Sequence, residues 1–215
     1  MDLTFSVKEK NTIVIARQLI NCKADIINSV PIFYRDDFFL KYMVIREVNG
    51  KYPQIPDDCF VAENATVVGD VALGAECSIW FNAVLRGDVH YIKIGNKVNI
   101  QDGAIIHCTY QKHPTIIGNN VSIGHNAIVH GCTIEDNVLI GMGAIVMDNC
   151  IIKSNCIIGA GAVVTQNTVV ESGTIYAGIP AKKVKDIDAS AFAGEIGRIS
   201  NNYVMYSSWF KDDQL

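Results

Sequence analysis

Residues 134–164 decide the fold, and in blocks of six they read IEDNVL, IGMGAI, VMDNCI, IKSNCI, IGAGAV and the first V of the next block. An aliphatic residue opens every block, and a small residue follows four positions later in most of them. These two positions are separated by an even step, so a strand places both side chains on the same side. A period of six fits neither an α-helix nor a plain alternating hairpin. It predicts a strand of about four residues followed by a two-residue corner.

The six-residue series extends in both directions from this stretch. It begins at Val61 and ends at Tyr176, with three extra residues before Ile94, five extra residues before Ile117 and one residue missing before Ile134. Three such units close a triangular prism with 18 residues per turn. The pattern resembles the hexapeptide-repeat left-handed parallel β-helix over residues 60–180. The predicted fold class is therefore all-β, a left-handed parallel β-helix with a C-terminal α-helix.

Composition supports a sheet protein and excludes several functional classes. The 215 residues include 30 Ile and 22 Val but only 7 Leu, a β-branched excess typical of sheets. A net charge of −4 gives no basic surface for nucleic acid or anionic lipid. No apolar run reaches the ~18 residues of a membrane helix, and Arg17 interrupts the apolar stretch 13–20 that a secretion signal would need. Seven scattered cysteines without a CxxC motif indicate a reducing, cytoplasmic location.

Three segments are expected along the chain. Residues 1–42 carry no hexapeptide and form an N-terminal extension, with Met43 as the expected natural start. Residues 43–185 form the β-helix domain, and residues 186–215 form a C-terminal helix and tail. The helix is predicted from an apolar stripe with alternating steps of four and three, made of Phe192, Ile196, Ile199, Tyr203, Tyr206 and Phe210.

Three side chains are predicted to form a column along one edge of the prism. His107 follows Ile106 and His130 follows Val129, and their separation of 23 residues is one 18-residue turn plus the five-residue insertion. Arg86 lies 21 residues before His107, one turn plus the three-residue insertion. Arg86, His107 and His130 therefore stack on adjacent turns, with their backbones about 4.8 Å apart.

His125 is predicted to lie on the preceding face, directly above Asp102. Its odd separation from His130 points the two side chains to opposite sides, and about 3.3 Å per residue puts them roughly 15 Å apart. A single subunit therefore cannot bring His125 to the other two histidines, whereas a neighbour around a three-fold axis can. Three imidazoles and a water form an open tetrahedral site that suits Zn²⁺, and Fe²⁺ as well.

The chain resembles the γ-class carbonic anhydrases over residues 44–213. The matching motifs are Arg86–Asp88, Asn99–Asp102, His107 and Gly124–Gly131. The resemblance implies a homotrimer that hydrates CO₂ to bicarbonate. It also implies that His107 and His130 of one subunit, with His125 of the next, bind the metal.

Further site residues are implied by the same resemblance. Arg86 would pair with Asp102 across the interface, Gln101 would hydrogen-bond the reacting hydroxide, and Asp88 would lie nearby. Tyr203 matches an active-site tyrosine on the C-terminal helix of some members. Each also has a plainer interpretation: a surface tripeptide for Arg86–Asp88, a solvated corner for Gln101 and Asp102, and a stripe residue of the helix for Tyr203.

The chain departs from the family at the residues that carry protons. Val89 follows Asp88 where a glutamate is expected, and residues 108–115 contain no acid. His90 or His113 could substitute, since imidazole titrates in the useful range, although a solvated or core histidine is the plainer interpretation. Family members with this shortened loop are similar to proteins whose CO₂ hydration activity is weak or absent.

Two other functions are compatible with the fold. One is a hexapeptide acyltransferase that uses acyl-CoA with a histidine as general base, and the other is a metal-bearing but catalytically weak scaffold or accessory protein. Gly159–Gly161 belongs to the repeat and is not a nucleotide loop. Cys77, Cys150 and Cys156 occupy inward slots and are expected to be core residues. Cys108 and Cys132 fall at different phases of the repeat, so no shared thiolate site is expected.

Overall fold

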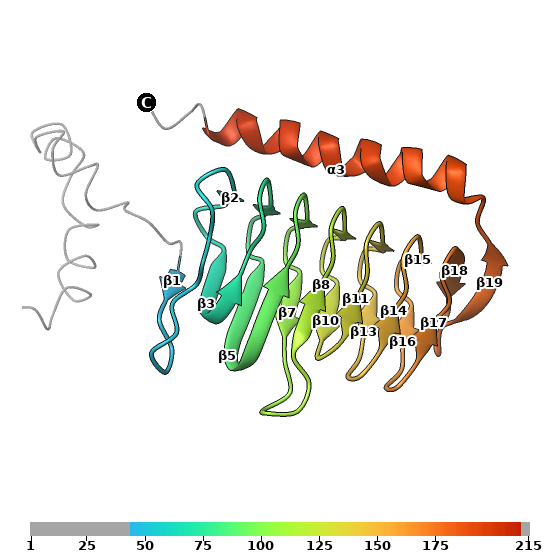
Figure 1. Cartoon of the computed structure of the whole chain (residues 1–215), viewed down its shortest axis with the longest axis horizontal. Coiled ribbons are helices and arrows are strands. Elements are labelled where there is room, and N and C mark those ends of the chain that lie inside the picture. The colour runs from blue at the N-terminus through green and yellow to red at the C-terminus, as the bar shows by residue number, and fades with distance from the viewer. Residues whose placement is uncertain (1–43, 212–215) are drawn as a thin grey trace, which may run out of the picture. The chain divides into compact units, whose positions relative to one another are not determined.

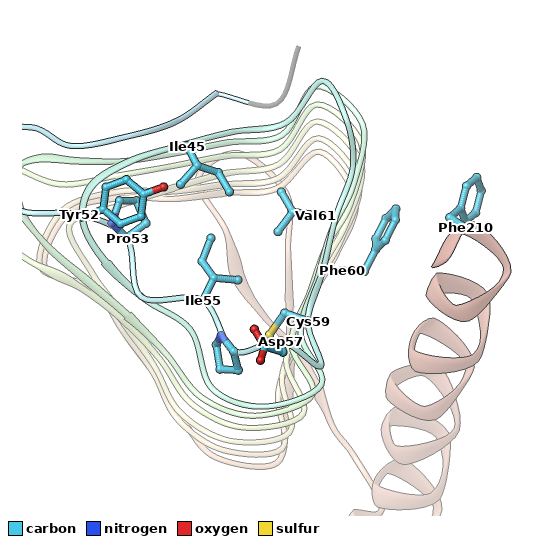
Figure 2. A pocket seen from close by; sticks show the side chains of 10 residues that line it. Ile45, Tyr52, Pro53, Ile55, Asp57, Cys59, Phe60, Val61 and Phe210 are labelled. Atoms are coloured by element: carbon cyan, nitrogen blue, oxygen red, sulfur yellow. The ribbon is translucent and has the colours of Figure 1, made fainter. Parts of the chain in front are cut away.

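The computed structural model describes residues 44–211. The expectation for residues 1–42 lies outside the described residues. The described chain winds into a β-solenoid of about 7 turns followed by one helix, which confirms the predicted left-handed parallel β-helix with its C-terminal helix. Figure 1 shows the turns stacked side by side, with the short strands of successive turns aligned. Figure 2 shows the same turns as nested triangular outlines.

The first face of the prism is a sheet of eight strands, parallel except at its C-terminal edge. Its strands are β2 (Phe60–Val61), β4 (Ser78–Ile79), β6 (Asn99–Ile100), β9 (Ser122–Ile123), β12 (Leu139–Ile140), β15 (Ile157–Ile158), β18 (Thr174–Ala177) and β19 (Lys182–Asp186). Because β19 runs antiparallel to β18, it closes the repeat at that end.

The second and third faces form one continuous sheet, because β3 (Thr66–Ala72) and β5 (Val84–Ile94) each turn a corner of the prism. The second face holds the first halves of β3 and β5 together with β1 (Val44–Arg46), β7 (Ile105–His107), β10 (Ile128–His130), β13 (Ile145–Val146) and β16 (Val163–Val164). The third face holds their second halves together with β8 (Thr115–Ile117), β11 (Thr133–Ile134), β14 (Ile151–Ile152) and β17 (Val169–Val170).

The residues that open the hexapeptides fill the prism. Ile100, Ile123 and Ile140 stack inward from the first face and are fully buried, as are Ile106 and Val129 on the second face. The small residues four positions later, among them Ala104, Ala127 and Ala144, are also fully buried where two faces meet. The predicted inward cysteines Cys77, Cys150 and Cys156 are buried as well.

The corners need left-handed backbone, and the sequence supplies it. The corner after β6 has Gly103 at φ 70°, and the same corner one turn later has Asn126 at φ 57°. Glycine and asparagine adopt this conformation at the lowest cost among L-residues. Gly103 is also required by space, since a Cβ there would lie 2.3 Å from the Asn126 side-chain oxygen. The residue that precedes this corner at Asn126 is His125.

The helix α3 (Ala189–Lys211) runs along the stack and contacts β2, β4 and β9 of the first face (Figure 1). Phe192 and Ile196 of the predicted stripe are buried, and Ile199, Tyr203 and Tyr206 are partly buried. Phe210 is 40% exposed, although its ring still packs against Phe60, Trp80 and Phe81. The stripe is thus buried at the start of the helix and partly open at its end.

The first turn leaves a cavity of about 470 Å³ at its end of the prism. Figure 2 shows Ile45, Ile55 and Val61 there, with Phe60 and Phe210 to one side. None of the five histidines lines this cavity. In the part of the chain that the structure describes, no helix is both long enough and apolar enough to span a bilayer.

Candidate functional site

His107 and His130 stand side by side on the second face. They end β7 and β10, and the two strands pair in parallel with His130 opposite His107. His107 Nδ1 lies 3.0 Å from His130 Nε2, and the ring centroids are 5.0 Å apart. The stacking predicted from the 23-residue separation is confirmed.

The spacing of these two nitrogens suits a shared metal ion. Two nitrogens bound at about 2.0–2.1 Å in a tetrahedral site lie roughly 3.3 Å from each other. The 3.0 Å between His107 Nδ1 and His130 Nε2 is close to that separation. The donor set therefore fits two ligands of a zinc or iron site without a rearrangement of the backbone.

Arg86 completes the predicted column. Its guanidinium donates to Asp88 Oδ2 at 2.7 Å, and its Nη2 lies 3.4 Å from His107 Nδ1. Asp88 Oδ1 in turn lies 3.1 Å from His107 Nε2. Arg86, Asp88 and His107 thus form one charged network at the edge of β5 and β7.

The network sets the protonation of its members. Burial alone would raise the pKa of Asp88, but hydrogen bonds from Arg86 and His107 outweigh it, and the pKa lies below its usual value. Burial lowers the pKa of His107, and the positive charge of Arg86 acts in the same direction, against the Asp88 hydrogen bond. An ionised Asp88 and a neutral His107 are the forms that a metal site requires, since only neutral imidazole binds a metal.

His130 has its own carboxylate. Its Nδ1 lies 2.9 Å from Asp148 Oδ1, and Thr109 Oγ1 donates to the same oxygen. Gln166 Nε2 donates to Asp148 Oδ2 at 3.3 Å. Burial would raise the pKa of Asp148, but the hydrogen bonds from Thr109, His130 and Gln166 lower it below the usual value.

His125 lies on a different face, as expected. It follows β9 of the first face, and its Nδ1 lies 2.9 Å from Asp102 Oδ2. Its side chain is 41% exposed. The contact with Asp102 leaves Nε2 as the nitrogen that can bind a further partner.

Gln101 and Tyr203 lie near His125. All three line an apolar cavity of about 440 Å³ between the first face and α3. Gln101 Nε2 donates to Asn99 Oδ1 at 2.9 Å, which leaves the Gln101 carbonyl oxygen as an acceptor. Burial raises the pKa of Tyr203, and the negative charge of Asp102 adds to the effect.

The predicted site residues therefore form two groups on two faces. Arg86, Asp88, His107 and His130 lie on the second face or its edge, whereas Gln101, Asp102, His125 and Tyr203 belong to the first face and α3. Within residues 44–211, no group of three or more His, Cys, Asp or Glu side chains is arranged to hold a metal ion. The structure thus brings His107 and His130 together on the second face and places His125 beside Asp102 on the first face.

His90 and His113, the two candidate proton carriers, each line a cavity together with an aspartate that contacts a histidine of the column. His90 lines a cavity of about 270 Å³ together with Asp88, and its Nδ1 accepts a hydrogen bond from the Tyr91 backbone N–H. His113 lines a cavity of about 140 Å³ together with Asp148. Both histidines are partly buried.

Two residues of the network around His130 carry no motif and were missed by the sequence analysis: Asp148 contacts His130, and Thr109 contacts Asp148. Asp148 follows His130 by 18 residues, one turn of the prism, so the period alone could have identified it. Thr109 lies in the five-residue insertion, where the period gives no position. The buried Cys108 and Cys132 are not part of the network, and burial raises the pKa of both thiols.

Comparison with known proteins links the chain to both the repeat and the chemistry. Residues 131–166 match the family model described as bacterial transferase hexapeptide (six repeats). A carbonic anhydrase from Geobacillus kaustophilus is 44% identical over 168 residues, which cover 78% of this chain and 91% of that protein. The mitochondrial gamma carbonic anhydrase 1 of Arabidopsis thaliana is 40% identical over 173 residues, covering 78% of this chain and 62% of that protein.

A solved structure gives a similar result for the fold. The crystal structure of a hexapeptide transferase family protein from Anaplasma phagocytophilum superposes with a TM-score of 0.73 at 36% identity. The match covers 78% of this chain and 98% of that one. The similarity therefore extends over nearly the whole of these two bacterial proteins.

Proposed function

The chain belongs to the γ-carbonic anhydrase family of hexapeptide-repeat proteins, and we propose that it hydrates CO₂ to bicarbonate at a metal site shared between subunits of a homotrimer. The observation that carries this proposal is the pair of nitrogens, His107 Nδ1 and His130 Nε2, that converge at 3.0 Å. A pair of ligands without a third among residues 44–211 of the same chain is what a site shared between copies requires.

The third ligand in this proposal is His125 of a neighbouring copy. Its exposure and its contact with Asp102 support the assignment, because the carboxylate holds Nδ1 while Nε2 remains directed to a partner. In a trimer, the first face of one copy would meet the second face of the next. Asp102 would then approach Arg86, and this pair would connect the subunits.

When bound, Zn²⁺ or Fe²⁺ would act as a Lewis acid that lowers the pKa of water to about 7 and so makes hydroxide available at neutral pH. Gln101 would orient the hydroxide through its carbonyl oxygen, since its amide nitrogen is held by Asn99. Asp88 and Arg86 would keep His107 in place. Tyr203 would border the site from α3, where it shares a cavity with Gln101 and His125.

Proton release is the step for which the chain is least well equipped. Residues 108–115 carry no acid. His90 lines the same cavity as Asp88, and His113 lines the same cavity as Asp148. We therefore expect slow turnover, limited by proton transfer and accelerated by added imidazole buffer.

The acyltransferase alternative has weaker support. The match to the transferase hexapeptide model covers residues 131–166, which contain none of the three proposed ligands. The match therefore identifies the hexapeptide repeat but does not indicate which reaction the chain catalyses. A trimer that binds metal but serves as a scaffold is the other alternative, and the acid-free loop favours it over an acyltransferase.

The test is stopped-flow CO₂ hydration on anaerobically purified protein, with the metal content determined on the same sample. Activity that scales with the metal and disappears on chelation supports the proposal. Acetyl-CoA turnover without hydration would support the acyltransferase. A fully metallated trimer without either activity would support the scaffold and contradict the enzymatic part of the proposal.

A further inference from the structure

Asp148 lies at the centre of a hydrogen-bond network around one of the proposed ligands. Its carboxylate accepts from Thr109 Oγ1, from His130 Nδ1 and from Gln166 Nε2. The three donors come from the loop after β7, from β10 and from the next turn of the prism. The carboxylate is therefore held from three directions, with its side chain only 20% exposed.

This arrangement fixes the tautomer of His130. Because a carboxylate accepts but does not donate, the proton of neutral His130 is held on Nδ1. Nε2 then carries the lone pair, and it is Nε2 that lies 3.0 Å from His107 Nδ1. The same contact also limits rotation of the imidazole ring.

The backbone next to His130 makes room for the carboxylate. Gly131 has φ 53°, and a Cβ at this position would lie 2.4 Å from Asp148 Oδ1. Glycine provides both the left-handed conformation and the space. The approach of Asp148 to His130 thus depends on the residue that follows the histidine.

The Asp136 carboxylate shows what a structural role looks like in this fold. Asp136 accepts from the backbone N–H and the side-chain amide of Asn119 on the adjacent turn, and so braces a corner. The hydrogen bonds that the structure gives the Asp148 carboxylate come from side chains alone, and one of these belongs to the histidine column. Asp136 therefore braces the backbone of a corner, whereas Asp148 holds the side chain of His130.

We propose that Asp148 is the positioning residue that sets the tautomer and orientation of His130 for metal binding, with Thr109 coupling the loop at residues 108–114 to that function. This inference rests on the proposed function. Partners of this kind change metal affinity by about 10- to 100-fold when they are removed.

The experiment compares Asp148→Asn with Asp136→Asn as a matched control. Zinc affinity is measured by competition with a chromophoric chelator, and the His130 tautomer is read from histidine ¹⁵N shifts in the metal-free protein. We expect Asp148→Asn to weaken zinc binding by about 10- to 100-fold and to reduce the Nδ1–H population of His130. Asp136→Asn should change neither quantity.

Thr109→Val and Thr109→Ser provide a second comparison that does not alter the carboxylate. The valine variant should weaken zinc binding, and the serine variant, which keeps the hydroxyl, should restore it. Wild-type zinc affinity and an unchanged His130 tautomer in Asp148→Asn would overturn the inference. Failure of the wild-type protein to bind zinc would instead contradict the proposed function, and the tautomer measurement would still decide the role of Asp148.

Discussion

The three histidines of the proposed site share one local arrangement. His107 contacts Asp88, His125 contacts Asp102 and His130 contacts Asp148, each between a ring nitrogen and a carboxylate oxygen at 2.9–3.1 Å. A histidine held through one nitrogen presents the other in a fixed direction. The repetition of this contact on two faces of the prism argues that the three side chains serve one purpose.

At the residue scale, ionisation of the Tyr203 hydroxyl tests whether this side chain is buried beside Gln101 and His125. Burial raises its pKa above the usual 10.0, so the folded state keeps the proton that the unfolded state loses. This contribution to stability is present below pH 10 and disappears as the pH rises through the raised pKa. We therefore expect the free energy of unfolding to fall above pH 10, and to fall less steeply in Tyr203→Phe.

Urea denaturation of both proteins at pH 8 and above pH 10 measures this difference. The values at pH 8 separate the general effect of the substitution from the effect of ionisation. Equal pH dependence in the two proteins would show that the Tyr203 hydroxyl is not held in a buried setting.

At the element scale, the packing of α3 on the prism depends on the buried residues of its apolar stripe. Ile196 is fully buried, whereas Met205 on the same helix is 47% exposed. We expect Ile196→Ala to lower the free energy of unfolding by about 2–5 kcal/mol. Met205→Ala, the matched control, should change it by less than about 0.5 kcal/mol. Chemical denaturation measures both, and a loss below about 1 kcal/mol for Ile196→Ala would mean that the helix is not packed as described.

The strands could be predicted from the sequence to a degree that the site could not. Each hexapeptide has an aliphatic residue that must face inward, so the positions of Ile100, Ile123 and Ile140 follow from spacing alone. The same arithmetic placed His130 opposite His107. Asp148 obeys the period too, but an aspartate in an outward slot resembles any solvated corner until its partners are known.

Insertions and long helices are harder to predict, for a physical reason. The loop at 108–114 departs from the repeat. The period therefore assigns Thr109 no position, and its contact with Asp148 could not be inferred from the sequence. On α3, the stripe pattern gives the face of the helix but not how closely each residue approaches the prism. Phe210 therefore fits the stripe and is still 40% exposed.

At the scale of the whole molecule, the proposed metal site depends on assembly. Arg86 pairs with Asp88 within the chain and is still 45% exposed, so it can also meet Asp102 of a neighbour. We expect Arg86→Ala to weaken each interface by about 2 kcal/mol or more, roughly a 30-fold rise in the dissociation constant. Lys183→Ala, which removes two exposed ion pairs, with Glu171 and with Asp186, is the control.

Sedimentation velocity over a dilution series measures this assembly. The Arg86→Ala trimer should dissociate at concentrations at which the wild-type and Lys183→Ala proteins remain assembled. Identical dissociation curves for all three proteins would argue against a contact between Arg86 and Asp102 across the interface.

The most direct test of the shared metal site is complementation between two inactive copies. His125→Ala keeps His107 and His130, while His107→Ala keeps His125, so neither variant alone should bind stoichiometric zinc. Subunit exchange in an equal mixture creates interfaces that combine the intact residues of both, and random mixing restores roughly one quarter of the wild-type zinc content. We expect this recovery in the mixture only. Full zinc content in either variant alone, or no recovery in mixed trimers, would contradict it.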